Sequence, residues 1–157
     1  MGLEDLPERG VYTLVIYVER EVELQVGSLG RARFKPGFYL YTGSALGRGP
    51  FGLRGRIRRH LRPVKKAFWH IDYLLNHPSA SIRAVVASGC SGRQECRVLK
   101  ALLASLGAEV PVQGFGASDC RSSCPAHLLF VGAHDPTEAV REVYVELGLK
   151  PLVVRPG

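Results

Sequence analysis

The feature that most constrains how this chain folds is a pair of short apolar runs, each with a tyrosine close to a glycine. The first opens with Gly10-Val11-Tyr12 and continues to Val18, and the second begins at Phe38 and leads into Tyr41-Thr42-Gly43. Alternating side chains, many of them β-branched or aromatic, favour strands. We predict strands over residues 11–18, 21–26 and 38–42, all in one antiparallel sheet.

Helical patterns fill much of the remaining chain. Apolar residues recur at helical spacing, bounded by glycine or proline, over about 53–61, 69–75, 91–106 and 136–147. The third segment starts with a capping-box pattern, Ser91-Gly92-Arg93-Gln94, and Pro136 fits the first position of the fourth helix. Two more strands are predicted over 81–87 and 127–131.

These elements define the fold class. A chain of 157 residues with 46% hydrophobic content suits one domain, residues 1–157. We predict an α/β protein of the α+β kind, in which a small, central, mostly antiparallel sheet is flanked by helices. No apolar run approaches the length of a membrane span, and the first residues do not resemble a secretory signal. The expected location is therefore the cytoplasm.

Positive charge is concentrated in one part of the sequence. The formal net charge is +7, and no acidic residue occurs between Glu23 and Asp72. The interval holds eleven cations: Arg31, Arg33, Lys35, Arg48, Arg54, Arg56, Arg58, Arg59, Arg62, Lys65 and Lys66. Such a run is usually a solvated face. Eleven uncompensated cations would repel one another, however, and an acidic polymer relieves that repulsion, so we favour a nucleic acid partner.

The predicted helix over residues 53–61 carries much of this charge on both sides of its apolar stripe. Arg56 and His60, four residues apart, lie along one margin of the stripe. The other margin and the segment that follows the helix are also basic. We expect nucleic acid to be bound mainly by Arg54, Arg58, Arg59, Arg62, Lys65 and Lys66.

Glu95 stands out because it projects onto the apolar face of its predicted helix. One interpretation is a first-turn glutamate that the helix dipole favours. The other is a carboxylate that holds a divalent metal at the end of a buried face, where oxygen ligands suit Mg²⁺ or Mn²⁺. The sequence pattern leaves both open.

The expected chemical state of the four cysteines depends on the source of the protein. The chain has one asparagine, three glutamines, one methionine and sixteen arginines, which hints at a hot environment. Cys90, Cys96, Cys120 and Cys124 would be free thiols in a mesophilic cytosol, whereas disulfides are credible in a hyperthermophile. The spacings of Cys90 to Cys96 and Cys120 to Cys124 do not match a zinc knuckle, which makes zinc the least favoured state.

The ordered series of motifs resembles the GIY-YIG nuclease family. It comprises Gly10-Val11-Tyr12, Tyr41-Thr42-Gly43, the Arg56 and His60 pair, and a strand followed by a helix with Glu95. The closer resemblance is to the Uri-type endonucleases, a branch long labelled a domain of unknown function and fused in some relatives to a DNA glycosylase. The segments that carry it are 37–45, 69–75, 114–120 and 125–128.

The resemblance implies a function and a set of residues. It implies a GIY-YIG-like core over about 10–106 with a family-specific extension over about 107–157. Tyr12, Tyr41, Arg56, His60 and Glu95 would be catalytic, with Glu95 as the ligand of Mg²⁺ or Mn²⁺. The expected activity is metal-dependent endonucleolytic cleavage of DNA in repair or processing.

Other readings of the same pattern stay open. One alternative is a binding module with weak or no activity that serves a repair enzyme such as a DNA glycosylase. Contact with RNA through the same basic face is a further one. The patterns assign no role to His70, Asp72, Asp119 or His127.

Overall fold

A five-stranded antiparallel sheet forms the centre of the molecule. The computed structural model describes residues 2–117 and 124–156. The strands lie in the order β6-β4-β1-β5-β7. Their bounds are β1 Gly10–Val18, β4 Gly37–Ala45, β5 Ala80–Gly89, β6 Leu128–Gly132 and β7 Leu152–Val154. The predicted central, antiparallel sheet is therefore confirmed.

The central strand β1 is buried on both faces. It pairs along its whole length with β4 on one side and β5 on the other, and the first register places Tyr12 opposite Gly43. Tyr12, Leu14 and Ile16 belong to the larger apolar core. Val11 and Val15 belong to the core on the opposite face. Successive side chains of a strand point to opposite faces, so β1 helps to build both cores.

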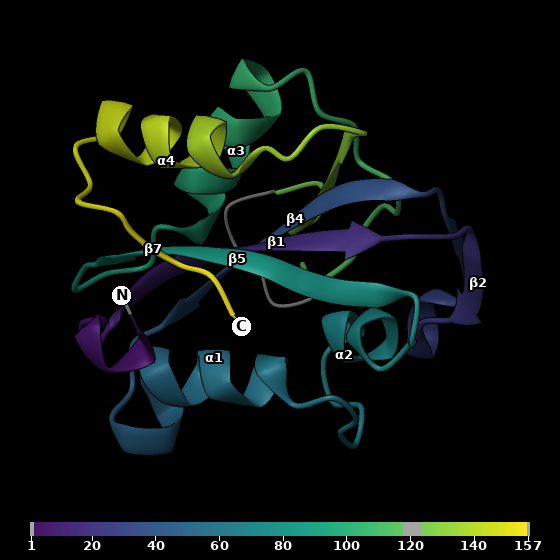
Figure 1. Ribbon diagram of the computed structural model, residues 1–157, viewed down its shortest axis with the longest axis horizontal. Helices are drawn as coiled ribbons and strands as arrows, with labels where there is room; N and C mark the ends of the chain where they lie inside the picture. The colour runs from purple at the N-terminus through teal and green to yellow at the C-terminus, as the bar shows by residue number, and fades with distance from the viewer. Residues whose placement is uncertain (1, 118–123, 157) are drawn as a thin grey trace.

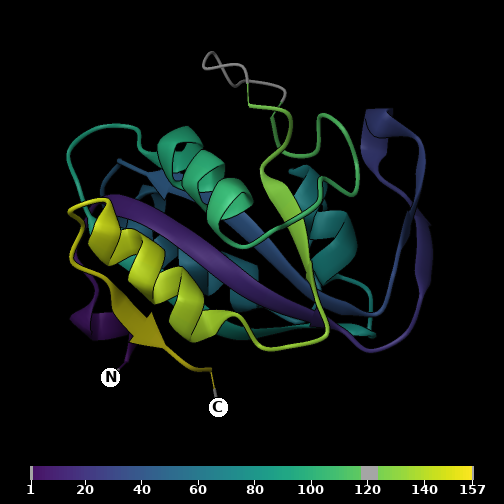
Figure 2. The same ribbon diagram turned by 90° about the horizontal axis from the view of Figure 1, so that it is seen from above.

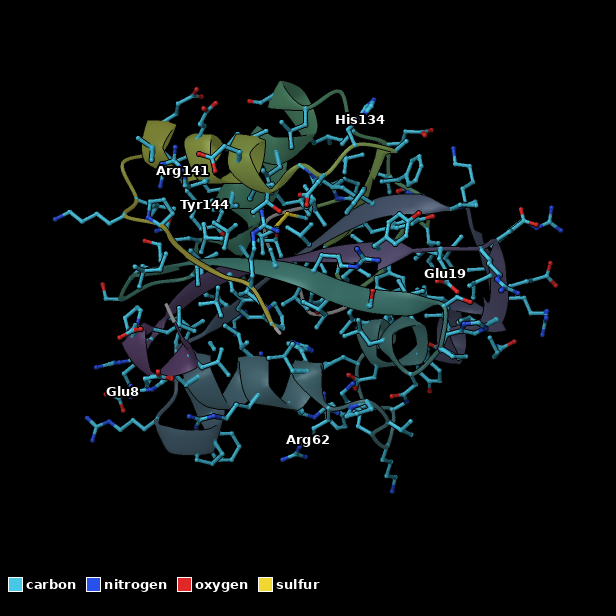
Figure 3. All side chains as sticks on the ribbon, in the orientation of Figure 1. Glu8, Glu19, Arg62, His134, Arg141 and Tyr144 are labelled. Carbon is cyan, nitrogen blue, oxygen red and sulfur yellow. A yellow bond between two sulfur atoms is a disulfide. The ribbon has the colours of Figure 1, made fainter. Side chains whose placement is uncertain are left out.

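Helices cover both faces of the sheet (Figure 1). On one face lie α1 (Leu53–Leu61) and α2 (His70–Leu75), and on the other lie α3 (Glu95–Ser105) and α4 (Thr137–Glu146). Figure 2 shows α3 and α4 running across the sheet from above. Short 3-10 helices occupy Leu3–Asp5, Gly27–Leu29 and Gly49–Phe51. In Figure 3, Tyr144 on α4 and Arg62 after α1 lie on opposite sides of the sheet.

Several predictions about the elements are wrong. The strand over 21–26 does not join the main sheet, because β2 (Val22–Gln25) pairs with β3 (Arg31–Phe34), a segment for which no strand is predicted. No strand is predicted over residues 152–154, where β7 forms. No side-chain cap hydrogen bond forms at the start of α3, where Gln94 is the N-cap. Pro136 is likewise the N-cap of α4 and not its first residue.

The lengths of the helices bear on membrane association. Within residues 2–117 and 124–156, no helix is both long and apolar enough to cross a bilayer.

Candidate active site

A polar cleft of about 450 Å³ opens where the ends of β1 and β4 meet α1 and α3. Four of the five predicted catalytic residues line it, each from a different element: Tyr12 from β1, Tyr41 from β4, Arg56 from α1 and Glu95 from α3. The fifth, His60, lies directly behind Tyr12. The cleft is also lined by Gly43, Ser44, Phe68, Trp69, His70, Arg93, Gly116 and His127.

The glycines of the two tyrosine motifs are explained by close approaches. A Cβ atom on Gly43 would lie 2.7 Å from the hydroxyl oxygen of Tyr12, so only glycine leaves room for this phenol across the β1–β4 pair. A Cβ atom on Gly10 would lie 2.1 Å from the backbone oxygen of Ser88 on β5. Each glycine thus lets a tyrosine-bearing strand pack closely.

Tyr12 and His60 form a buried hydrogen-bonded pair. The Tyr12 hydroxyl lies 2.8 Å from Nε2 of His60. Burial raises the pKa of Tyr12 to about 12, although the neighbouring Arg56 opposes the rise. Burial also lowers the pKa of His60 to about 3. Both groups are therefore neutral at physiological pH, and the histidine tautomer decides which one donates.

Tyr41 reaches the same cleft from β4. Burial raises the pKa of its hydroxyl well above the ordinary value. Its ring lies edge-on to His60, with the centroids 6.0 Å apart. Gly116 has a positive φ of 72°, and a Cβ atom there would lie 3.0 Å from the Tyr41 ring. The glycine-rich segment after α3 therefore packs directly on this tyrosine.

Arg56 brings positive charge to the cleft in a fixed position. Its guanidinium donates a hydrogen bond of 3.2 Å to the backbone oxygen of Ser44. It also lies over the indole ring of Trp69, 4.6 Å from the ring centroid. Stacking and a backbone acceptor leave some of its five N–H donors for an anion.

Glu95 is the carboxylate of the cleft, and it faces inward as predicted, with 8% of its surface exposed. Ser44 Oγ donates to Glu95 Oε2 at 2.5 Å, and Arg93 lies 3.3 Å from Oε1. Burial opposes ionisation of Glu95, but the Ser44 hydrogen bond and Arg93 outweigh it, so the pKa lies below the ordinary value. Glu95 is an ionised oxygen donor at neutral pH.

Several residues of the cleft, among them Ser44, His70 and His127, were not predicted as site residues from the sequence. Ser44 follows the second tyrosine motif directly, and that position was the available signal. His70 Nδ1 accepts a 2.8 Å hydrogen bond from the backbone of Gly116, and His127 lies just before β6 and beside Glu95. No spacing links these histidines to the motifs. Asp119 and Cys120 lie outside the described residues.

The contacts of Asp72 indicate a structural role. It is fully buried and accepts hydrogen bonds from both terminal nitrogens of Arg59, at 2.9 and 2.8 Å. The backbone N–H groups of Phe68 and Trp69 also donate to it. Burial raises its pKa, but Arg59 and these N–H groups outweigh that effect and hold it below the ordinary value. Asp72 thus fixes the chain that carries Trp69 into the cleft.

The predicted nucleic-acid-binding residues differ in their surroundings. Arg59 is engaged by Asp72 and lies over Trp69, 4.3 Å from the ring centroid. Lys65 is not an exposed cation, because its Nζ atom is buried without a hydrogen-bond partner among the described residues. Burial lowers the pKa of Lys65. Arg58, Arg62 and Lys66 are exposed, and Arg54 is half-buried, with a bond to the backbone of Glu4.

The positive charge of the basic interval is also partly compensated, contrary to the prediction. Arg31 and Arg33 each lie 3.1 Å from Glu23. Lys35 lies 3.0 Å from Glu109. Among the described residues, the cations of the interval that form no ion pair therefore lie on α1 and on the segments before and after it.

Two of the cysteines are joined. The structure links Cys96, in the first turn of α3, to Cys124 by a disulfide, whose sulfur atoms appear in Figure 3. Among the described residues Cys90 is a free thiol. Sequence spacing could not have identified this pair, because 28 positions separate its members.

Comparison with other proteins places the chain in a family. No curated protein and no solved structure matches it. A family with the description "Domain of unknown function DUF123" matches residues 11–149, which span the sheet from β1 to β6, all four α-helices and every residue of the cleft. The chain belongs to this family.

Proposed function

We propose that this protein is a metal-dependent DNA endonuclease of the GIY-YIG type, in the Uri-type branch, that hydrolyses phosphodiester bonds in DNA repair or processing. The observation that carries the proposal is the meeting of Tyr12, Tyr41, Arg56 and Glu95 in one cleft. They come from four elements and are up to 83 positions apart in the sequence. Their convergence supplies a cation, a carboxylate and two hydroxyl groups around a space large enough for a phosphate.

The donor chemistry of Glu95 fits a hard divalent cation. Mg²⁺ usually binds through one or two carboxylates and keeps several waters, with substrate phosphate oxygens completing its shell. Glu95 offers an ionised carboxylate at the wall of the cleft. When bound, Mg²⁺ or Mn²⁺ would act as a Lewis acid on the phosphate. A metal has to compete with Ser44 and Arg93 for the two oxygens.

Arg56 stabilises charge on the phosphate. Hydrolysis places growing negative charge on the phosphate oxygens, and a preorganised cation in a restricted site lowers the energy of that charge. Arg56 is preorganised by Ser44 and Trp69. It therefore needs little rearrangement when the substrate enters.

The tyrosines orient the attacking water. A phenol with a pKa of about 12 is seldom ionised near pH 7, so Tyr12 is a poor general base. Its hydroxyl is instead held in place by His60 and can hold a water by a hydrogen bond. Tyr41, whose pKa is also raised, has the same chemical capacity on the adjoining wall.

The test is cleavage of a panel of labelled DNA structures (single-stranded, duplex, flap, branched and abasic) with Mg²⁺, Mn²⁺ or EDTA. We expect cleavage of at least one structure with either metal and none in EDTA, and the Glu95→Gln protein serves as the matched inactive control. Intact substrates under every metal condition would overturn the proposal.

The arrangement around Glu95 favours a second candidate. Because Ser44 and Arg93 already engage both of its oxygens, the chain would be a nucleic-acid-binding module for a partner repair enzyme if no metal displaces them. DNA or RNA binding without cleavage, unchanged by EDTA, would support this candidate over the endonuclease.

A further inference from the structure

A cluster of soft ligands lies next to the cleft and has no part in the mechanism above. Cys96 is the second residue of α3 and follows Glu95 directly, while Cys124 and His127 belong to the segment that leads into β6. The ligand atoms of these three residues all lie within 4.8 Å of one another. Sγ of Cys96 lies 3.6 Å from Nε2 of His127.

The chemistry of this cluster differs from that of Glu95. Two cysteine sulfurs and an imidazole nitrogen suit a borderline-soft cation such as Zn²⁺, whereas Mg²⁺ prefers oxygen. Cys124 and His127 are separated by two residues, so one loop can bring both to the same ion. Cys96 approaches from the helix on the other side.

Two of the three ligands are held in place by the fold. The backbone N–H of His127 donates to Phe115 at 2.7 Å, and its carbonyl oxygen accepts from the N–H of Thr42 at 3.0 Å. Cys96 lies in the first turn of α3, whose apolar side is fixed in the core by Val98, Leu99 and Leu102.

We propose that Cys96, Cys124 and His127 bind a Zn²⁺-type cation when the protein is reduced, and that the Cys96–Cys124 disulfide is the oxidised, metal-free state of the same site. Three protein ligands leave the fourth tetrahedral position for water or another donor. One pair of sulfurs cannot form a disulfide and bind the ion as thiolates at the same time, so the two states exclude each other.

The conversion between the states balances. A dithiol reductant supplies two electrons and two protons to the S–S bond and becomes a disulfide itself. The two thiols that form release their protons to solvent as Zn²⁺ binds the thiolates. No other reactant is required.

The site has a structural consequence for the cleft. In either state it ties residues 124–127, which lead into β6 and include His127 of the cleft, to the helix turn that carries Glu95. In the intermediate state, reduced and without metal, this tie is absent. The proposal does not depend on nuclease activity, because metal binding is measured without DNA.

The test uses Co²⁺ and Zn²⁺ with the full chain after reduction by a phosphine and removal of metal. We expect about one equivalent of Co²⁺ to give thiolate-to-metal absorption, and Zn²⁺ to displace it. Cys96→Ser, Cys124→Ser and His127→Asn should each weaken Zn²⁺ binding by more than about 10-fold, the smallest loss typical even of outer-shell changes. Cys90→Ser, which removes a thiol that is free among the described residues, should bind like the wild type.

A comparison of redox states needs no substitution, so it tests the proposal even if the variants fail to fold. The oxidised wild-type protein should show no thiolate absorption with Co²⁺, and reduction should restore it. Absence of that absorption in the reduced wild type would overturn the proposal. Wild-type Zn²⁺ affinity in the folded Cys96→Ser protein would do the same.

Discussion

The hydroxyl oxygen of Tyr12 lies 2.8 Å from Nε2 of His60, and both side chains are almost completely buried between β1 and α1. The register of β1 against β4 and the spacing of residues along α1 both allow this contact. Gly43 lies opposite Tyr12 and leaves space for its ring, and His60 lies one turn after Arg56, which lines the cleft. The histidine therefore positions the tyrosine, while Arg56 faces the space where a phosphate would bind.

The first prediction concerns the groups that would act on one chemical step. We expect Tyr12→Phe, Tyr41→Phe and Arg56→Ala each to reduce cleavage by at least about 100-fold, as the loss of one preorganised donor does in other enzymes. Because they serve the same step, the double variant Tyr12→Phe with Arg56→Ala should lose much less than the product of the single losses. Single-turnover cleavage rates measure this.

A matched control lies on the same strand as Tyr41. Tyr39 is buried and donates its hydroxyl to the backbone oxygen of Lys35, outside the cleft. Tyr39→Phe also removes a tyrosine hydroxyl, so it should leave cleavage near the wild-type rate. Equal losses in Tyr39→Phe and Tyr41→Phe would indicate an effect on folding and contradict the catalytic assignment.

The second prediction separates Glu95 as a metal ligand from Glu95 as a first-turn acid. Glu95→Gln keeps the size of the side chain and an oxygen for Ser44, but it removes the charge that a hard cation needs. Cleavage should fall by more than about 100-fold while DNA binding persists, since outer-shell partners of metals alone contribute ~10–100-fold. The free energy of unfolding should change by about 1 kcal/mol or less.

The matched control for Glu95→Gln is a substitution of Arg93, which contacts Glu95 but is not a proposed metal ligand. Arg93→Gln removes the cation beside Glu95 and keeps the carboxylate. We expect this variant to need no more metal than the wild type, because one competitor for the carboxylate has been removed. Metal titrations of both variants give the comparison, and full metal-dependent activity in Glu95→Gln would show that another residue holds the metal.

The sequence predicted this site better than its surroundings. The glycines of the tyrosine motifs are constrained by contacts between neighbouring strands, so the motifs indicate how β1 and β4 pair. No comparable motif indicates that β2 pairs separately with β3, because a short strand can pair at either edge of a sheet. Ser44 and His127 reach the cleft by tertiary packing, for which no sequence periodicity exists.

Charge was the property that the sequence described least well. Ion pairs form between residues distant in sequence, so a run without acidic residues can still be compensated. Glu109 reaches Lys35 across 74 positions, and Asp72 binds Arg59 although it lies beyond the end of the interval. Lys65 illustrates a related point, because a basic residue next to a helix need not be exposed.

The third prediction applies this corrected charge map to binding. Arg58, Arg62 and Lys66 are exposed and form no ion pair with any described residue, so they should contact phosphates, together with Arg54. For about four phosphate contacts, log affinity should fall against log salt with a slope of roughly −3 to −4. Substitution of Arg58, Arg62 or Lys66 by Gln should reduce the magnitude of that slope by about 1 each.

Control substitutions for the salt dependence come from the β2–β3 pair. Arg31 and Arg33 are also exposed but are paired with Glu23. Arg31→Gln should therefore leave the slope almost unchanged in fluorescence anisotropy titrations. An affinity that does not depend on salt would refute the proposed electrostatic surface.

The fourth prediction concerns an exposed aromatic residue at the rim of the cleft. Phe68 has 78% of its surface exposed, and its ring meets Trp69 edge-on with the centroids 5.4 Å apart. An exposed ring beside cations can stack on an unpaired base. Phe68→Ala should weaken binding of single-stranded DNA by about 1–3 kcal/mol and affect duplex DNA less. Phe51→Ala changes a phenylalanine outside the cleft that is 71% exposed, and it is the control.

The last prediction is the pH dependence of stability that Asp72 confers. The folded protein holds the pKa of Asp72 below its ordinary value, so its contribution is fully present above the unfolded pKa of about 3.9. It is lost as the pH falls through the lower pKa of the folded state. Asp72→Asn should lower the free energy of unfolding by about 2 kcal/mol at pH 7, less than the 3–5 typical of fully buried pairs, because Arg59 is partly exposed.

Urea denaturation at a series of pH values tests this linkage. The difference between wild type and Asp72→Asn should be constant from pH 7 to about pH 5 and should shrink below about pH 4, as Asp72 is protonated in the unfolded and then in the folded wild type. The exposed acid Glu142 provides the control, since Glu142→Gln should change stability by less than about 0.5 kcal/mol. A difference that stays constant down to the lowest pH would mean that the Asp72 charge contributes nothing to stability, and that the loss arises only from altered packing around Trp69.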